Sequence, residues 1–100
     1  MLLRERETPE GLLVSVCDPD CIGETYTDDG VSLDVTEDFY GGDEAETADE
    51  DAVVDSLTRA TVANIVGEES VSVAIDAGLV DEETVLEVDG TLHAQLLWLR

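Results

Sequence analysis

Charge constrains this sequence more than any other feature. The chain carries 26 acidic residues against four basic ones, which gives a formal net charge of −22. Such a charge with low hydrophobicity would predict disorder, but 43% of the residues are apolar and they recur with regular periods. We therefore interpret the acids as a surface adapted to concentrated salt, because at about 1 M salt the Debye length is only about 3 Å. In dilute buffer the same charge is expected to destabilise the compact state.

The charge also limits the partners that the chain can bind. All of its basic residues are arginines, at positions 4, 6, 59 and 100. Phosphate backbones and anionic membranes are bound by clustered Lys and Arg. Direct nucleic-acid contact is therefore disfavoured without being excluded, and no membrane partner is expected. Because no apolar run approaches the length of a signal peptide or a membrane span, we expect a cytoplasmic location.

The length of 100 residues predicts a single domain over residues 1–100. Alternating apolar residues and turn signals predict strands in the first third of the chain, at Leu2–Glu7, Leu12–Cys17, Glu24–Thr27 and Val31–Val35. The last two flank Asp28-Asp29-Gly30 and are expected to form a hairpin. We expect Val31, Leu33 and Val35 to point inward. The segment Asp18–Gly23 is expected to form a turn or a single helical turn.

Two helices are predicted in the middle of the chain. Thr47 and Glu50 have the spacing of a capping box, which predicts a helix that runs to about Val66 and ends at Gly67. Asn64 would then lie within the apolar stripe of this helix. A second helix is predicted over Val71–Leu79, because its apolar residues follow the helical period.

A hairpin is predicted at the end of the chain, with strands Thr84–Val88 and Thr91–Leu99 joined by Asp89-Gly90. Pairing outward from this turn sets Val88 opposite Thr91 and Leu86 opposite His93. Strands, two helices and strands together predict an α+β fold: a two-layer sandwich, with a mostly antiparallel sheet and two helices packed on one face. The apolar end, Leu96–Leu99, also allows a homodimer that pairs across a two-fold axis.

The segment Phe39-Tyr40-Gly41-Gly42 is the first candidate binding site. Two aromatic residues before two glycines offer a rigid contact surface beside backbone that a partner can approach closely. The alternative is structural: Phe39 fills the core, and the glycines turn the chain toward the helix.

Three polar residues, Asn64, His93 and Gln95, are the second candidate site. A histidine can act as a general acid or base near neutral pH, and the amides could orient a substrate. The alternative is again structural, since a buried amide or imidazole normally finds hydrogen-bond partners within the fold.

No metal site or cofactor is predicted. Cys17 and Cys21 form a lone C-x3-C pair without a second ligand pair, and His93 is far away in sequence. We expect one of the two cysteines to be buried and the other to be partly exposed. The acidic run Asp43–Asp51 lacks the ligand spacing of a calcium loop and is interpreted as a solvated loop.

Several short segments together resemble the archaeal domain-of-unknown-function family 424. They are Cys17-Asp18, Ile22-Gly23, Phe39-Tyr40-Gly41-Gly42, the run from Ala63 to Glu68, and His93-Ala94-Gln95. The resemblance spans nearly the whole chain, and with the acidity it indicates a halophilic archaeal member. It implies a small cytoplasmic α/β protein whose genes lie near translation and ribosome-maturation genes, but no established activity, cofactor or catalytic residue. Cys21 departs from the family pattern, in which an aliphatic residue is usual.

Two functional hypotheses follow. The first is a non-enzymatic binding module with a protein or ribonucleoprotein partner from translation or RNA metabolism. The alternative is a small enzyme or ligand-binding domain that uses His93 with Asn64 and Gln95. The two differ in whether these three residues converge on one pocket.

Overall fold

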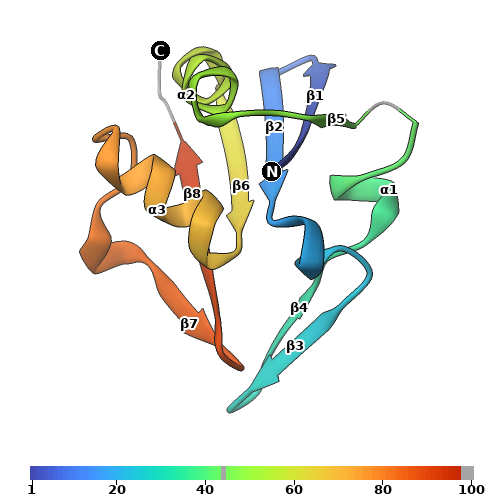
Figure 1. Ribbon diagram of the computed structural model, residues 1–100, viewed down its shortest axis with the longest axis vertical. Helices are drawn as coiled ribbons and strands as arrows, with labels where there is room; N and C mark the ends of the chain where they lie inside the picture. The colour runs from blue at the N-terminus through green and yellow to red at the C-terminus, as the bar shows by residue number, and fades with distance from the viewer. Residues whose placement is uncertain (44, 98–100) are drawn as a thin grey trace.

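The computed structural model describes residues 1–43 and 45–97 (Figure 1). Its helices are α1 (Glu37–Tyr40), α2 (Glu50–Arg59) and α3 (Glu68–Asp76), with 3-10 turns η1 (Pro19–Cys21) and η2 (Glu82–Thr84). Its strands are β1 (Leu2–Thr8), β2 (Gly11–Cys17), β3 (Thr25–Asp28), β4 (Val31–Asp34), β5 (Glu46–Thr47), β6 (Val62–Val66), β7 (Leu86–Val88) and β8 (Thr91–Leu97).

A six-stranded mixed sheet forms the centre of the fold, in the order β5-β1-β2-β6-β8-β7. Strands β2 and β6 are parallel, and the other neighbouring strands in this sheet pair antiparallel. Strands β3 and β4 form a separate antiparallel hairpin. The predicted α+β class, with a mostly antiparallel sheet, is confirmed.

Helices α2 and α3 cover one side of this sheet, as predicted. The core beneath them is aliphatic and includes Val14, Val16, Leu57, Ile65 and Val71, all fully buried. In an aliphatic core of this kind, each buried Val, Leu or Ile side chain contributes about 1.5–3 kcal/mol relative to exposure. We call this side of the sheet the covered face.

The opposite side of the sheet is covered only in part. A second cluster of buried residues, Cys17, Cys21, Val35, Tyr40 and Val66, joins the ends of β2 and β6 to α1 and the β3–β4 hairpin. In Figure 1, α1 lies on the right of the view and α3 on the left. Among the described residues, no helix or hairpin packs over the rest of this side, toward the other ends of β2, β6 and β8.

The first predicted helix extends too far, because it includes residues that form a separate strand. Helix α2 ends at Arg59, and Val62–Val66 is the strand β6 between β2 and β8. A short apolar run fits either period, so periodicity alone does not separate a buried strand from a continued helix. Here β6 pairs with a strand on each side, and these backbone hydrogen bonds decide the conformation. Asn64 therefore lies on a strand, which corrects its predicted place in a helix.

Three smaller predictions are also wrong. The residue that caps α2 is Asp49, which accepts from the Ala52 backbone N–H at 2.9 Å, while Thr47 belongs to β5. Val31 points outward and is 48% exposed, because the tip of its hairpin extends beyond the sheet. Cys21 is buried like Cys17, since η1 turns it into the second cluster.

Candidate functional site on the open face of the sheet

Cross-strand register arranges the uncovered side of the sheet in rows. One row runs from Arg6 through Leu13 and Val62 to Leu97, and the next from Arg4 through Ser15 and Asn64 to Gln95. Cross-strand partners point to the same side of a sheet, so both rows lie on its uncovered side, although Ser15 in the second row is buried. We define the open face as the residues of these rows on β2, β6 and β8 that reach solvent: Leu13, Val62, Asn64, Gln95 and Leu97.

The open face combines apolar side chains with an amide pair. Leu97 is 64% exposed, and Leu13 and Val62 are half-buried beside it and border a cavity of about 290 Å³. In the next row the Gln95 Nε2 donates to the Asn64 Oδ1 at 3.0 Å. An exposed apolar row beside a pair of side-chain amides is typical of an interaction surface, where apolar contacts provide area and a few polar groups fix the orientation.

The strands place no carboxylate on the side of the open face. The acids of the sheet strands are Glu5, Glu7, Glu46 and Glu87. Their register partners are Val14, Leu12, Leu3 and Leu92, which all pack in the core under α2 and α3. All four acids therefore point to the covered side, in a chain in which about one residue in four is acidic. Acids outside the sheet strands do lie near this side: Glu10 borders the same cavity as Leu13, and α1 with its Asp38 packs against Arg4 and Arg6.

Arg4 and Arg6 fasten α1 to the sheet at the β1 side of the open face. Both guanidinium groups donate to the Asp38 carbonyl oxygen, and Arg4 Nη1 also donates to the Gly41 carbonyl oxygen at 3.2 Å. Arg6 lies over the Phe39 ring, 5.2 Å from its centroid. These cations neutralise the carbonyl end of α1 and are already engaged with protein.

The structure divides the first candidate segment between core and surface. Tyr40 is only 3% exposed, and burial raises the pKa of its hydroxyl well above the ordinary value. Its ring meets the half-buried Phe39 edge-on at 5.0 Å. Gly41 is buried, whereas Gly42 is exposed and adopts a φ of 83°. The structural alternative therefore holds in part, because an aromatic residue of this segment does fill the core, although it is Tyr40 and not Phe39. Phe39 and Gly42 remain accessible.

The second candidate set, Asn64, His93 and Gln95, lies on one side of the sheet. His93 pairs with Val66 and Leu86, one row beyond the amide pair. Partial burial lowers the pKa of its imidazole. A cavity of about 260 Å³ is lined by His93, Gln95 and Thr84 but not by Asn64. Within the described residues, no hydroxyl, thiol or carboxylate hydrogen-bonds to His93. The structure therefore brings the three residues to one side of the sheet, with Asn64 outside the cavity that His93 and Gln95 line.

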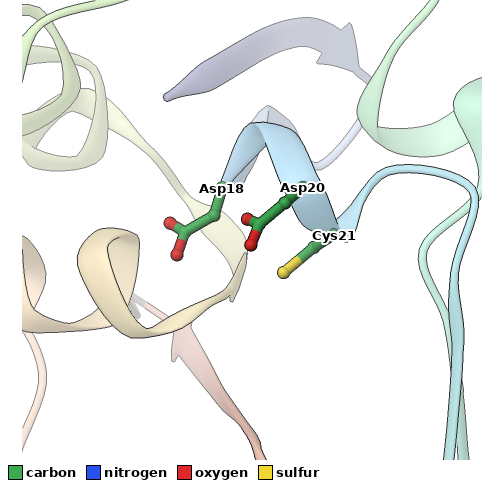
Figure 2. Close-up of side chains that lie close together, drawn as sticks. All are labelled: Asp18, Asp20 and Cys21. Carbon is green, nitrogen blue, oxygen red and sulfur yellow. The ribbon is translucent and has the colours of Figure 1, made fainter.

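A cluster of possible metal ligands lies at η1, where Asp18, Asp20 and Cys21 place ligand atoms within 4.8 Å of one another (Figure 2). The Asp18 carboxylate, however, accepts from the backbone N–H groups of Glu69 and Ser70 at 3.0 and 2.8 Å, and from the Ser70 hydroxyl at 2.6 Å. It thus caps the N-terminus of α3 from another segment. We interpret the cluster as structural: it links the end of β2 to the N-terminus of α3, and we call this contact the joint between β2 and α3.

Gly67 is the residue that makes this joint possible. It has a φ of 110°, and an added Cβ would lie 2.3 Å from the carboxyl carbon of Asp18. Sequence reasoning missed the joint, although Cys17-Asp18 and Gly67-Glu68 both belong to the segments that carried the family resemblance. Burial raises the pKa of the neighbouring Cys17 thiol to about 12, which keeps it neutral.

These features define a class of protein: a small α+β domain whose helices cover one side of a mixed sheet and leave an apolar and amide surface on the other. The chain belongs to the family described as "Protein of unknown function (DUF424)", which matches residues 5–99. The predicted family is thereby confirmed. Its description assigns no activity.

Among solved structures, the chain is similar to an uncharacterized conserved protein from Methanopyrus kandleri. The two share 27% sequence identity and a TM-score of 0.74, over 99% of this chain and 94% of that one. No curated protein matches the chain. Every helix in the described part of the chain is too short or too polar to cross a membrane.

Proposed function

We propose that this protein is a non-enzymatic binding module and that its open face is the surface that contacts a protein partner. The observation that carries the proposal is the distribution of the acids. All carboxylates of the sheet strands point to the covered side, although the chain has a formal net charge of −22. A surface that only has to stay hydrated in salt has no reason to exclude acids, whereas a contact surface does, because desolvating an unpaired carboxylate is costly.

The composition of the open face favours a protein partner over a nucleic acid. Recognition of phosphates needs free cations that release counterions, but Arg4 and Arg6 already donate to carbonyl oxygens of α1. The row of Leu13, Val62 and Leu97 instead offers apolar area of the kind found at the centre of protein interfaces. The translation machinery is the proposed setting, on the strength of the family resemblance alone.

Site-specific photocrosslinking tests this function. Leu97→benzoylphenylalanine places a photoreactive side chain on the open face, and Val31→benzoylphenylalanine is the matched control on the β4 hairpin, where Val31 is also exposed. Both proteins are irradiated in an extract of the source cells in molar KCl. We expect a discrete protein adduct from position 97 and none from position 31, with the adduct identified by mass spectrometry.

Three results bear on the proposal in different ways. An adduct with a ribosomal protein or translation factor supports both the module and its setting. An adduct with a different protein, or with a second copy of the chain, supports the module and removes the setting. Equal labelling from both positions, or no adduct from position 97, overturns the proposed function.

A further inference from the structure

We infer that the outer edge of β8 binds an extended segment of the partner protein, which adds a strand to the sheet beside Gln95 and Leu97. The inference rests on the proposed function, since both residues belong to the open face and the segment would come from the same partner. Three observations carry it: backbone groups of β8 that lack a strand partner, two cavities along this edge, and the charges around it.

The outer edge of β8 is covered by β7 over only part of its length. Strand β8 is seven residues long, but its pairing with β7 ends where His93 lies opposite Leu86. The same register, if continued, would set Thr84 opposite Gln95. Thr84 instead belongs to η2, where its backbone N–H donates to the Asp81 carbonyl oxygen at 3.0 Å. The chain therefore bends away before it can pair with the last part of β8.

The hydrogen-bond pattern identifies the backbone groups that this bend leaves unpaired. The Leu92 carbonyl oxygen accepts from the N–H of Gly67, the residue after β6, at 2.9 Å, so Leu92 directs its backbone groups toward β6. Successive residues of a strand direct these groups to opposite edges, so Gln95 and Leu97 direct theirs to the outer edge. Within the described part of the chain, neither β7 nor any turn supplies them with a backbone partner. Such an edge is a template for another strand.

Two cavities lie along the unpaired part of β8. Both are bordered by Gln95 on β8 and by Thr84 on η2, so they belong to one groove between the strand and the turn. One has a volume of about 260 Å³ and includes His93, and the other has about 240 Å³ and includes the buried Val80 and Leu96. Side chains of an added strand alternate between the two sides of a sheet. Successive residues of the segment can therefore enter the two cavities in turn.

The unpaired part of β8 is also uncharged. Residues 94–97 are alanine, glutamine and two leucines, although 30% of the chain is charged. On the strand β1, near the opposite edge of the sheet, pairing with β5 ends at Leu3, and residues 4–7 alternate arginine and glutamate. Charged side chains on an edge strand prevent pairing with other chains. The sequence therefore blocks strand addition at β1 and leaves it open at β8.

The surroundings of the groove favour a basic extended segment as its occupant. Thr84 faces β8 across both cavities, so a single strand fits between them, whereas the edge of a folded sheet, such as that of a second copy, would bring neighbouring strands against η2. Asp81 borders the second cavity, and Glu82 and Glu83 follow it on η2. Neither cavity is lined by a basic residue of the described chain. Complementary charge orients a partner, so we assign basic residues to the segment beside its apolar ones.

Amide hydrogen exchange of the full chain, followed by NMR with a synthetic peptide of alternating valine and lysine, tests the inference. In the free chain, the N–H groups of Gln95 and Leu97 should exchange freely, while pairing with β6 protects those of Ala94 and Leu96. Saturating peptide should slow exchange at Gln95 and Leu97 by about tenfold or more. A peptide of alternating valine and glutamate is the matched control and should bind about tenfold more weakly. KCl is held at the lowest concentration at which circular dichroism shows the folded chain, because salt screens charge.

A backbone substitution then tests whether the edge itself is recognised. Leu97→Pro removes the outward N–H, which an edge strand tolerates, whereas Leu97→Ala shortens the side chain and keeps the N–H. We expect Leu97→Pro to bind the basic peptide about threefold to tenfold more weakly than Leu97→Ala does. If Leu97→Pro does not fold, the same test is made on the wild type with a basic peptide N-methylated at alternate residues, which should not bind.

Several results overturn the inference. They are protection of Gln95 and Leu97 in the free chain, no slowing of their exchange by the basic peptide, equal binding of the acidic peptide, and binding that survives N-methylation. Protection that appears in the free chain as the protein concentration rises identifies a second copy as the occupant and also overturns it. If the peptide does not bind β8 but position 97 still crosslinks to another protein, only the mode of contact is wrong and the proposed function stands.

Discussion

The covered and open faces belong to the same strands but carry different chemistry. On the covered side, Val14, Ala63 and Ile65 are fully buried under α2 and α3, and the acids of the sheet lie around this core. On the open side, the neighbouring residues include Asn64 and Gln95 and the exposed Leu97, with no acid from the strands. The difference shows that the location of the carboxylates carries more information than their number. The absence of strand carboxylates from the open face marks it as the surface that is expected to be desolvated when a partner binds.

The largest effect should come from a matched pair of truncations, one on each side of the sheet. Leu57→Ala removes a fully buried side chain of α2 and should cost about 2–5 kcal/mol of unfolding free energy, because it leaves a cavity. Leu97→Ala removes the same atoms from the open face and should cost less than about 0.5 kcal/mol. Urea denaturation in molar KCl measures both. Equal losses would mean that Leu97 is part of the core.

The next effect separates a structural carboxylate from a solvated one. Asp18→Ala removes the side chain that caps α3 and should cost about 1–2 kcal/mol. Asp20→Ala is the control: Asp20 lies beside Asp18 in Figure 2 but is exposed, so its loss should change stability by less than about 0.5 kcal/mol. The same denaturation experiment compares them. Similar losses from the two variants would contradict the assignment of Asp18 as the cap.

Local signals in the sequence predicted much of the fold. Asp89-Gly90 correctly set the register of the last hairpin, with Val88 opposite Thr91 and Leu86 opposite His93. Helix α3 was predicted over Val71–Leu79 but lies three residues earlier at both ends, at Glu68–Asp76. The cap that starts it comes from Asp18, a distant residue, and spacing within the helix does not reveal such a partner. The predicted part of the last strand beyond Leu97 lies outside the described residues.

The candidate site was predicted in part. Asn64, His93 and Gln95 were chosen as candidates and do lie on one side of the sheet, although Asn64 was assigned to a helix, and their role in binding stays a prediction. Asn64 lies opposite Gln95 because β6 lies between β2 and β8. Local periodicity predicts individual strands but not their order in a sheet. The absence of acids from the open face could not be recognised before that order was known. With the strands in place, it follows from the alternation of side chains.

The smallest effect should appear in the pH dependence of stability, where the two faces respond in different ranges. Partial burial lowers the pKa of His93 below its ordinary 6.5, so the unfolded chain binds this proton more readily than the folded one. Its contribution to stability is complete above that pH and is lost as the pH falls toward the folded value. On the covered side, hydrogen bonds from Ser56 and Arg59 lower the pKa of Glu5 below its ordinary 4.5. Its contribution is therefore lost only at lower pH.

His93→Gln should remove the slope that begins as the pH falls through the ordinary 6.5 of the imidazole and leave the slope below 4.5, while Glu5→Gln should do the opposite. The His93 slope is expected to be shallow, because the ring is only half-buried and remains partly solvated. Urea denaturation at a series of pH values, with KCl held constant, gives both profiles. If His93→Gln follows the wild type throughout, the imidazole is solvated equally in the folded and unfolded chains.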